Sequence, residues 1–364
     1  MSFITRRKTT AGAAKAAGVD ALLVTHLPDV CWLCGFTGSN AALVLLAGSR
    51  LRAVLFTDGR YTAQAKAEAT GIKVVIAAKS AAIAACEWMA TAGVERCGFD
   101  DGNTSVAALK QMRAAVPAKL RRRIFEPVGP LVAKLRWVKD ADEIARMRKA
   151  AALGCRLFEG ILGTMQPGMR EDAVAAELEY AARLAGAEAM SFPTIVASGK
   201  RSSLPHGRAT AAKLPKRGFV TLDFGVVLDG YCSDMTRTVH LGRASATERE
   251  AYEAVLEAQE AGVAAVRAGI ASGDVDEAAR AVLRKAELDK WFTHSTGHGV
   301  GLEIHEGPRV AAKQTQTLEA GMVITIEPGI YMPGKFGVRI EDMVLVTAEG
   351  GEILTPCTKA WIEL

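Results

Sequence analysis

Acidic side chains end two short apolar runs in the second half of the chain. Asp223 follows the run Phe219–Leu222, and Glu327 follows the run Met322–Ile326. A carboxylate at the end of a buried strand is costly unless a cation or a hydrogen-bond donor meets it. A single such residue is usually a turn or cap residue, so what matters is how many of them gather in one place.

A second aspartate lies close enough in sequence to join the first. Asp234 follows Asp223 by eleven positions, and Asp229-Gly230 lies between them. An Asp-Gly pair between two apolar runs is typical of a hairpin turn. A hairpin there would fold both carboxylates onto one site.

Two further segments add a histidine and a glutamate. The segment from His294 to Gly301 contains His298 among three glycines, which argue against a helix. In a strand, His294 and His298 would share a face, because four residues is an even step. Arg339 and Glu341 share a face for the same reason, just before the apolar run that begins at Met343.

These residues together favour a metal site over any other chemistry. Four carboxylates packed together repel one another unless metal ions neutralise them. Oxygen-rich sites with one imidazole suit Mn²⁺, Co²⁺ or Zn²⁺, and five such side chains can hold two ions. The predicted ligands are Asp223, Asp234, His298, Glu327 and Glu341. The sequence contains no G-x-S-x-G elbow, Walker A motif or dinucleotide fingerprint.

Composition excludes several other classes of protein. The formal net charge of +5 is small for 364 residues. The clusters Arg6–Lys8 and Arg121–Arg123 carry no interleaved aromatics, so we expect solvated surface charge and no nucleic-acid binding. The most apolar run, Ala41–Gly48, is too short to span a membrane, and no signal-peptide core follows the N-terminus. We therefore expect a soluble cytoplasmic protein.

The seven cysteines form no disulfide framework and suit a reducing compartment. Cys31 and Cys34 match C-x-x-C, but they have no second pair for zinc and lie in a stretch that resembles an apolar strand. We expect both to be buried as small hydrophobic residues.

The elements that must position these residues divide the chain in two. Residues 20–126 alternate strand-like and helix-like segments, which indicates an α/β domain over residues 1–126. Pro127–Pro130 begins a linker over residues 127–139. Residues 140–364 begin with a helix for which Asp140 and Glu143 have capping-box spacing. The expected strands are 20–25, 41–46, 52–57 and 72–77, and the expected helices are 61–69, 80–92, 103–115 (capped by Asn103), 171–184, 246–268 and 272–286.

The motifs in the second half resemble the pita-bread metallopeptidases, the family of methionine aminopeptidase, aminopeptidase P, prolidase and creatinase. The resemblance spans residues 140–364 and implies an α+β pita-bread catalytic domain. The α/β N-terminal domain resembles the one that precedes this domain in aminopeptidase P, prolidase and creatinase. The matching segments are Leu222–Gly225, Gly230–Thr238, Thr296–Gly301, Ile326–Gly329 and Val338–Asp342.

The resemblance implies roles for individual residues. The five predicted ligands hold two divalent ions, most simply Mn²⁺, with Co²⁺ or Zn²⁺ as alternatives. Glu327 is the general base, and His206 and His305 steady the oxyanion or donate to the leaving nitrogen. Arg339 orients Glu341. The remaining implied positions are pocket-lining ones: Tyr231, His294 and Arg309.

The implied activity is hydrolysis of the bond before a proline at the second position of a peptide, by a homodimer. Gly35–Asn40 and Thr57–Tyr61 resemble bacterial Xaa-Pro aminopeptidases and favour that activity slightly. Arg309 resembles the prolidase arginine that grips a substrate carboxylate, so a dipeptidase stays open. A metal-free interaction module and a creatinase-like hydrolase are weaker alternatives, because all five ligands are present.

Overall fold

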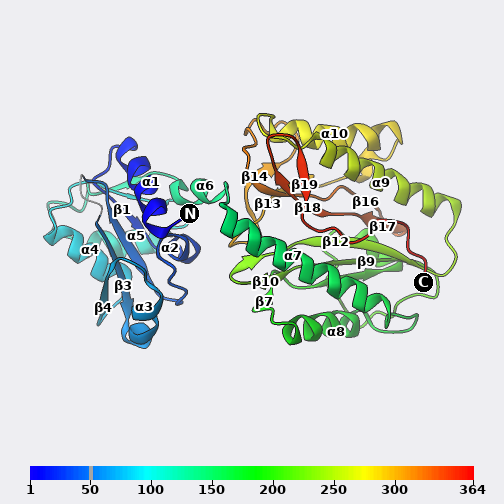
Figure 1. The fold of residues 1–364 in the computed structure, drawn as a ribbon, viewed down its shortest axis with the longest axis horizontal. Coiled ribbons are helices and arrows are strands. Elements are labelled where there is room, and N and C mark those ends of the chain that lie inside the picture. The colour runs from blue at the N-terminus through cyan, green and yellow to red at the C-terminus, as the bar shows by residue number, and fades with distance from the viewer. Residues whose placement is uncertain (49–51) are drawn as a thin grey trace. The chain divides into compact units, whose positions relative to one another are not determined.

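The computed structural model describes residues 1–48 and 52–364, which form two compact units, Met1–Arg136 and Trp137–Leu364 (Figure 1). The segment expected as a linker contains a helix, α6 (Leu131–Arg136), which belongs to the first unit. Arg136 at its end is buried and donates to Asp29 at 2.6 Å. In the described part of the chain, no helix is both long and apolar enough to cross a membrane.

The first unit is an α/β domain, as predicted. Its mixed sheet has the strand order β4-β3-β2-β1-β5-β6, in which β1, β2 and β3 are antiparallel neighbours and the other pairs are parallel. The strands are β1 (Ala21–Val24), β2 (Ala42–Leu46), β3 (Arg52–Asp58), β4 (Lys73–Ala77), β5 (Cys97–Phe99) and β6 (Phe125–Pro127). The helices that accompany them are α1 (Phe3–Ala16), α2 (Leu27–Cys34), α3 (Thr62–Glu68), α4 (Ala81–Thr91) and α5 (Val106–Ala114).

Three features of this unit differ from expectation. Cys31 and Cys34 lie in a helix, α2, and not in a strand. Pro28 lies in the first turn of this helix, and Gly35 ends it in the left-handed conformation, at φ 86°. Helix α5 is capped by Ser105, whose hydroxyl accepts from the amide of Ala108, rather than by Asn103.

The third difference is helix α1, which sequence analysis did not predict. Two of the three residues in its basic cluster are not solvated: Arg6 and Arg7 are buried, whereas Lys8 is exposed as expected. Arg7 Nη1 donates to the carbonyls of Leu33 at 2.9 Å and Thr70 at 3.1 Å. Guanidinium groups here satisfy backbone carbonyls that lack helical partners, which is why charged residues could be buried.

The second unit begins with two predicted helices: the first starts where its capping box predicts, and the second has the predicted bounds. Helix α7 (Ala141–Leu162) starts with a complete capping box between Asp140 and Glu143. Helix α8 (Glu171–Leu184) follows, and both pack with β9 and β12 around an apolar core that includes Phe158, Leu178 and Leu222.

Strands and two more helices complete this unit. The three-stranded sheet β12-β9-β8 carries Asp223, and the five-stranded sheet β14-β13-β15-β18-β19 carries His298. Asp234, Glu327 and Glu341 lie directly beside the ends of strands of these two sheets. The strands are β7 (Ala189–Met190), β8 (Ile195–Ser198), β9 (Gly218–Phe224), β10 (Val226–Leu228), β11 (Tyr231–Cys232), β12 (Met235–Leu241), β13 (Gly297–Gly299), β14 (Glu306–Val310), β15 (Val323–Ile326), β16 (Gly329–Met332), β17 (Phe336–Arg339), β18 (Asp342–Val346) and β19 (Gly351–Ile353). Helices α9 (Ala246–Ala265) and α10 (Ser272–Lys285) lie side by side (Figure 1).

Candidate metal centre

A hairpin and a strand pairing bring Asp223 and Asp234 to one pocket. Asp229 and Gly230, at φ 50° and 77°, form the two-residue turn that joins β10 to β11. Beyond it, β12 pairs antiparallel with β9, so that Thr236 lies opposite Asp223. Both carboxylates line the same cavity, of about 630 Å³.

The other sheet supplies His298 and Glu327. His298 lies on β13, whose register requires Gly297, because a Cβ there would lie 1.8 Å from the carbonyl oxygen of Thr325. Thr325 Oγ1 accepts from the amide of His298 at 3.1 Å and donates to Glu327 Oε1 at 3.3 Å. Strand β13 is too short to include His294, which lies before it but lines the same cavity.

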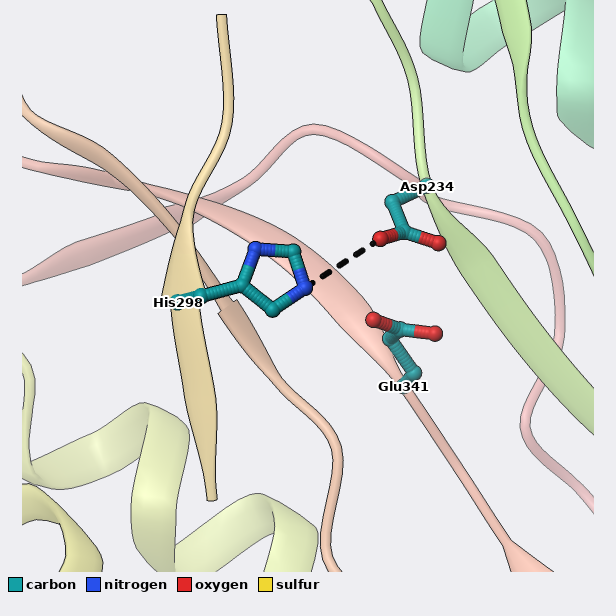
Figure 2. A group of neighbouring side chains, drawn as sticks. All are labelled: Asp234, His298 and Glu341. Carbon is teal, nitrogen blue, oxygen red and sulfur yellow. Dashed lines mark ion pairs between the residues drawn. The ribbon is translucent and has the colours of Figure 1, made fainter. Parts of the chain in front are cut away.

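Asp234, His298 and Glu341 point toward one another from three different segments (Figure 2). One ligand atom from each of them lies within 4.8 Å of the others. His298 Nε2 is 3.5 Å from Asp234 Oδ2 and 3.6 Å from Glu327 Oε1. The described residues therefore gather three carboxylates around one imidazole nitrogen.

Asp223 lies in the same cavity but is held by a cation of the chain. Arg339 Nη2 donates to Asp223 Oδ2, and Arg339 Nε donates to Thr236 Oγ1 at 3.0 Å. Thr236 Oγ1 in turn donates to Glu341 Oε2 at 2.7 Å. Arg339 thus contacts one predicted ligand directly and reaches Glu341 through Thr236.

Thr236 and Tyr331 belong to the site but are not among the residues predicted from the sequence. Tyr331 is buried, and its hydroxyl oxygen accepts from Arg339 Nη1 and lies 3.0 Å from His294 Nε2. The sequence offered one signal: Tyr331 lies four residues beyond Glu327, in the next strand, where a hydroxyl among apolar residues needs a partner.

Burial and mutual repulsion dominate the electrostatics of the cluster. Burial raises the pKa of Asp234 and of Glu341 well above the usual range, and the neighbouring carboxylates raise both further. Burial also raises the pKa of Glu327 to about 8 and lowers the pKa of His298 to about 4. Each shift disfavours the charged form of its group, as expected from burial, and in Asp234 and Glu341 the repulsion between acids adds to it.

The donor set fits divalent metal ions. Carboxylate oxygens with one imidazole nitrogen are ligands of Mn²⁺, Co²⁺ and Zn²⁺. The arginine in contact with these acids binds Asp223, which leaves Asp234, Glu327 and Glu341 without a lysine or arginine ion-pair partner among the described residues. Positive charge between these carboxylates would relieve both the burial cost and the repulsion.

The remaining predicted site residues divide into two groups. His206, His294, His305, Arg309 and Arg339 all line the cavity. Tyr231 does not: it is buried in an apolar cluster, and its hydroxyl donates to Glu143 Oε1 at 2.7 Å. Tyr231 therefore secures the first turn of α7, and its closeness in sequence to Asp234 was no guide to where its side chain lies.

Comparison with known proteins connects this geometry to a family. Residues 145–348 match metallopeptidase family M24, and residues 6–138 match the creatinase/prolidase N-terminal domain. An Xaa-Pro dipeptidase of Pyrococcus horikoshii is 34% identical over 340 residues, which are 93% of this chain and 93% of the relative.

Two solved structures resemble the whole chain. The Xaa-Pro dipeptidase from Bacillus anthracis has a TM-score of 0.95 and 38% identity, and the match covers 100% of both chains. The X-Pro aminopeptidase from Thermotoga maritima has a TM-score of 0.88 and 33% identity, and the match covers 97% of this chain and 100% of that one. The α/β domain and the catalytic domain expected from the sequence are both confirmed.

Proposed function

Because the chain belongs to metallopeptidase family M24, we propose that it is an Xaa-Pro dipeptidase that uses two divalent metal ions. The motifs Gly35–Asn40 and Thr57–Tyr61 slightly favour the aminopeptidase. The comparisons support the dipeptidase better, since the Bacillus anthracis dipeptidase exceeds the Thermotoga maritima aminopeptidase in both identity and TM-score. The aminopeptidase is the second candidate, supported by that same match over nearly the whole chain.

The observation that carries this proposal is the composition of one cavity. The acids and His298 lie in it together with Arg309, which is exposed and has no acidic partner in the described part of the chain. Apolar side chains line it as well, including Phe192 and Ile304. A dipeptide Xaa-Pro offers matching groups: a scissile carbonyl, an apolar ring and a free carboxylate.

The proposed ligands of the ions are Asp223, Asp234, His298, Glu327 and Glu341. When bound, two divalent ions lower the pKa of a water molecule and polarise the carbonyl that it attacks. Manganese is the ion we propose first, with cobalt and zinc as alternatives, because all three accept this donor set.

Three side chains handle protons and charge in this proposal. Glu327 accepts the proton of the attacking water through its carboxylate. His305 and His206 donate N–H groups to the developing oxyanion or to the leaving prolyl nitrogen. His305 is suited to donate as a neutral imidazole, because burial lowers its pKa, and its ring lies 4.5 Å from that of His298 between centroids.

A substrate panel tests the proposal directly. Purified enzyme loaded in turn with Mn²⁺, Co²⁺ and Zn²⁺ is assayed on Ala-Pro, Ala-Pro-Ala and Met-Ala. The dipeptidase predicts cleavage of Ala-Pro and little cleavage of the other two. Equal cleavage of Ala-Pro-Ala would establish the aminopeptidase instead, and cleavage of Met-Ala alone would contradict both.

A further inference from the structure

A buried glutamate fixes the segment that forms one wall of the cavity. Glu171 is fully buried at the start of α8, and both of its carboxylate oxygens accept hydrogen bonds. Oε1 accepts from the amide and the hydroxyl of Ser198, each at 2.9 Å, and Oε2 accepts from Thr210 Oγ1 at 2.9 Å. Arg201 Nε donates to Oε2 at 3.0 Å. One carboxylate thus ties together both ends of the segment 198–210.

Arg208 lies in this segment with its backbone held on three sides. Its carbonyl accepts from Arg201 Nη2 at 2.8 Å, its amide donates to His206 O at 2.9 Å, and it forms a bridge with Ile195. Gly207 before it is tightly packed, because a Cβ there would lie 2.9 Å from that of Ala197. The position of Arg208 is therefore set by the fold, although its side chain is exposed.

Arg208 lies on the wall of the cavity, and in the described part of the chain it has no acidic partner. Arg208 lines the cavity together with Arg309. Two acids that line the same cavity are engaged elsewhere: Asp223 by Arg339, and Glu306 by Lys139 at 3.1 Å. Among the residues that the structure describes, neither Arg208 nor Arg309 forms an ion pair. The cavity is thus lined by two arginines without ion-pair partners, in addition to the acidic cluster that suits metal.

We infer that Arg208 is a specificity-determining residue that binds, together with Arg309, the free carboxylate of the substrate's proline. This inference deepens the proposed function and rests on it. A carboxylate neutralises both guanidinium groups at once and accepts charge-assisted hydrogen bonds from each. A peptide that continues beyond proline has an amide in that place, which carries no charge to offset the two cations. Arg208 therefore selects dipeptides over longer chains.

A pair of substrates that differ only in this charge isolates the effect. The KM values for Ala-Pro and Ala-Pro-amide are measured for the wild type, Arg208→Gln, Arg208→Lys and Arg208→Gln/Arg309→Gln, each loaded with Mn²⁺. We expect Arg208→Gln to raise KM for Ala-Pro ~10-fold more than KM for Ala-Pro-amide. The kcat for Ala-Pro should change little. Arg208→Lys should recover part of the loss, since it retains the charge but not the planar fork.

Arg243→Gln is the matched control. Arg243 is exposed on the loop after β12, does not line the cavity, and its removal changes the net charge by the same amount. It should leave the ratio of the two KM values unchanged. Melting temperature and metal content of every variant show whether the fold and the site are intact.

The outcomes separate this inference from the function on which it rests. A wild type that cleaves Ala-Pro while Arg208→Gln changes acid and amide alike, or neither, would overturn the role of Arg208 and leave the dipeptidase intact. A wild type that prefers Ala-Pro-amide or Ala-Pro-Ala to Ala-Pro would overturn both, before any variant is made.

Discussion

Glu341 and Asp342 are neighbours in the chain, yet they enter opposite electrostatic environments. Glu341 faces the other acids of the cavity, and burial followed by repulsion from Glu327 and Asp223 raises its pKa well above the usual range. Asp342 faces away, where its oxygens accept from Arg237 at 2.8 Å and from Lys359 at 2.7 Å. Both carboxylates are buried.

The difference teaches how to distinguish a structural buried acid from a functional one. Asp342 is surrounded by donors that belong to the chain, with Gln259 Nε2 at 2.9 Å and Thr355 Oγ1 at 2.9 Å in addition to the two cations. Among the described residues, the side-chain donor to Glu341 is Thr236 Oγ1 alone. A buried charge that the chain compensates stabilises a fold, whereas clustered acids that it does not compensate are arranged for ions from solution.

The strand register explains why adjacent residues can differ so much. Asp342 begins β18, and successive side chains of a strand point to opposite faces. Arg237 couples the two environments, because its Nη1 donates to the backbone carbonyl of Glu341 while its Nη2 donates to Asp342 Oδ1. The paired charges around Asp342 thus hold the backbone of Glu341, whose own carboxylate belongs to the acidic cluster of the cavity.

The largest effect should come from Glu327→Gln. An amide is a poor ligand and no base, so we expect at least a ~100-fold loss in kcat on Ala-Pro. The melting temperature of the metal-free protein should not fall, because removing one of several repelling acids relieves repulsion. Glu253→Gln, at an exposed position on α9, is the control. A kcat near that of the wild type would refute the role of Glu327.

In the cluster of paired charges around Asp342, a substitution should lower the stability of the protein. Arg237→Met leaves Asp342 without its main partner, and breaking a buried pair costs about 3–5 kcal/mol. Denaturant unfolding of the metal-free protein measures this loss, with Arg267→Met, exposed beyond α9, as the control. If the free energy of unfolding changes by less than ~1 kcal/mol, the contrast between the two clusters does not hold.

Removing metal should destabilise the protein, and this effect should depend on the acidic cluster alone. A ligand held at 100 times its Kd stabilises the folded state by about 2.7 kcal/mol, so chelation should lower the melting temperature and Mn²⁺ should restore it. The metal-dependent part of the shift should vanish in the double variant Asp234→Asn/Glu341→Gln. Equal melting temperatures for the chelated and the Mn²⁺-loaded wild type would count against a metal centre at these residues.

Substitutions of the three histidines should separate metal binding from turnover. His298→Ala should lose metal, because its Nε2 lies between the carboxylates of Asp234 and Glu327. His305→Ala and His206→Ala should keep metal and lower kcat ~100-fold or less. Metal analysis beside kinetics decides the matter: loss of metal from His305→Ala equal to that from His298→Ala would show that this division of roles is wrong.

The smallest effect should come from Tyr231→Phe. Its hydroxyl supports Glu143 within the capping box of α7 and lies outside the cavity. Loss of one hydrogen bond costs about 1 kcal/mol, so stability should fall slightly and kcat/KM should stay within about twofold. A loss of kcat/KM beyond tenfold would place Tyr231 in the site after all.

The sequence determined the local structure wherever local signals were strong. The capping box at Asp140, the turn at Asp229-Gly230 and the bounds of Glu171–Leu184 all follow from neighbouring residues. It also supplied the acids and His298 as candidates, because a carboxylate that ends a buried apolar run is costly unless a cation or a donor meets it.

Only the tertiary structure decided which partners those residues have. Helix α1 buries Arg6 and Arg7 against carbonyls from distant segments, and Tyr231 turns to Glu143. Thr236 connects Arg339 to Glu341, and Tyr331 connects it to His294. Nor does sequence reveal that Glu341 is uncompensated while Asp342 is satisfied. Hydrogen bonds and ion pairs act over a few ångströms between residues some hundred positions apart, so no spacing along the chain encodes them.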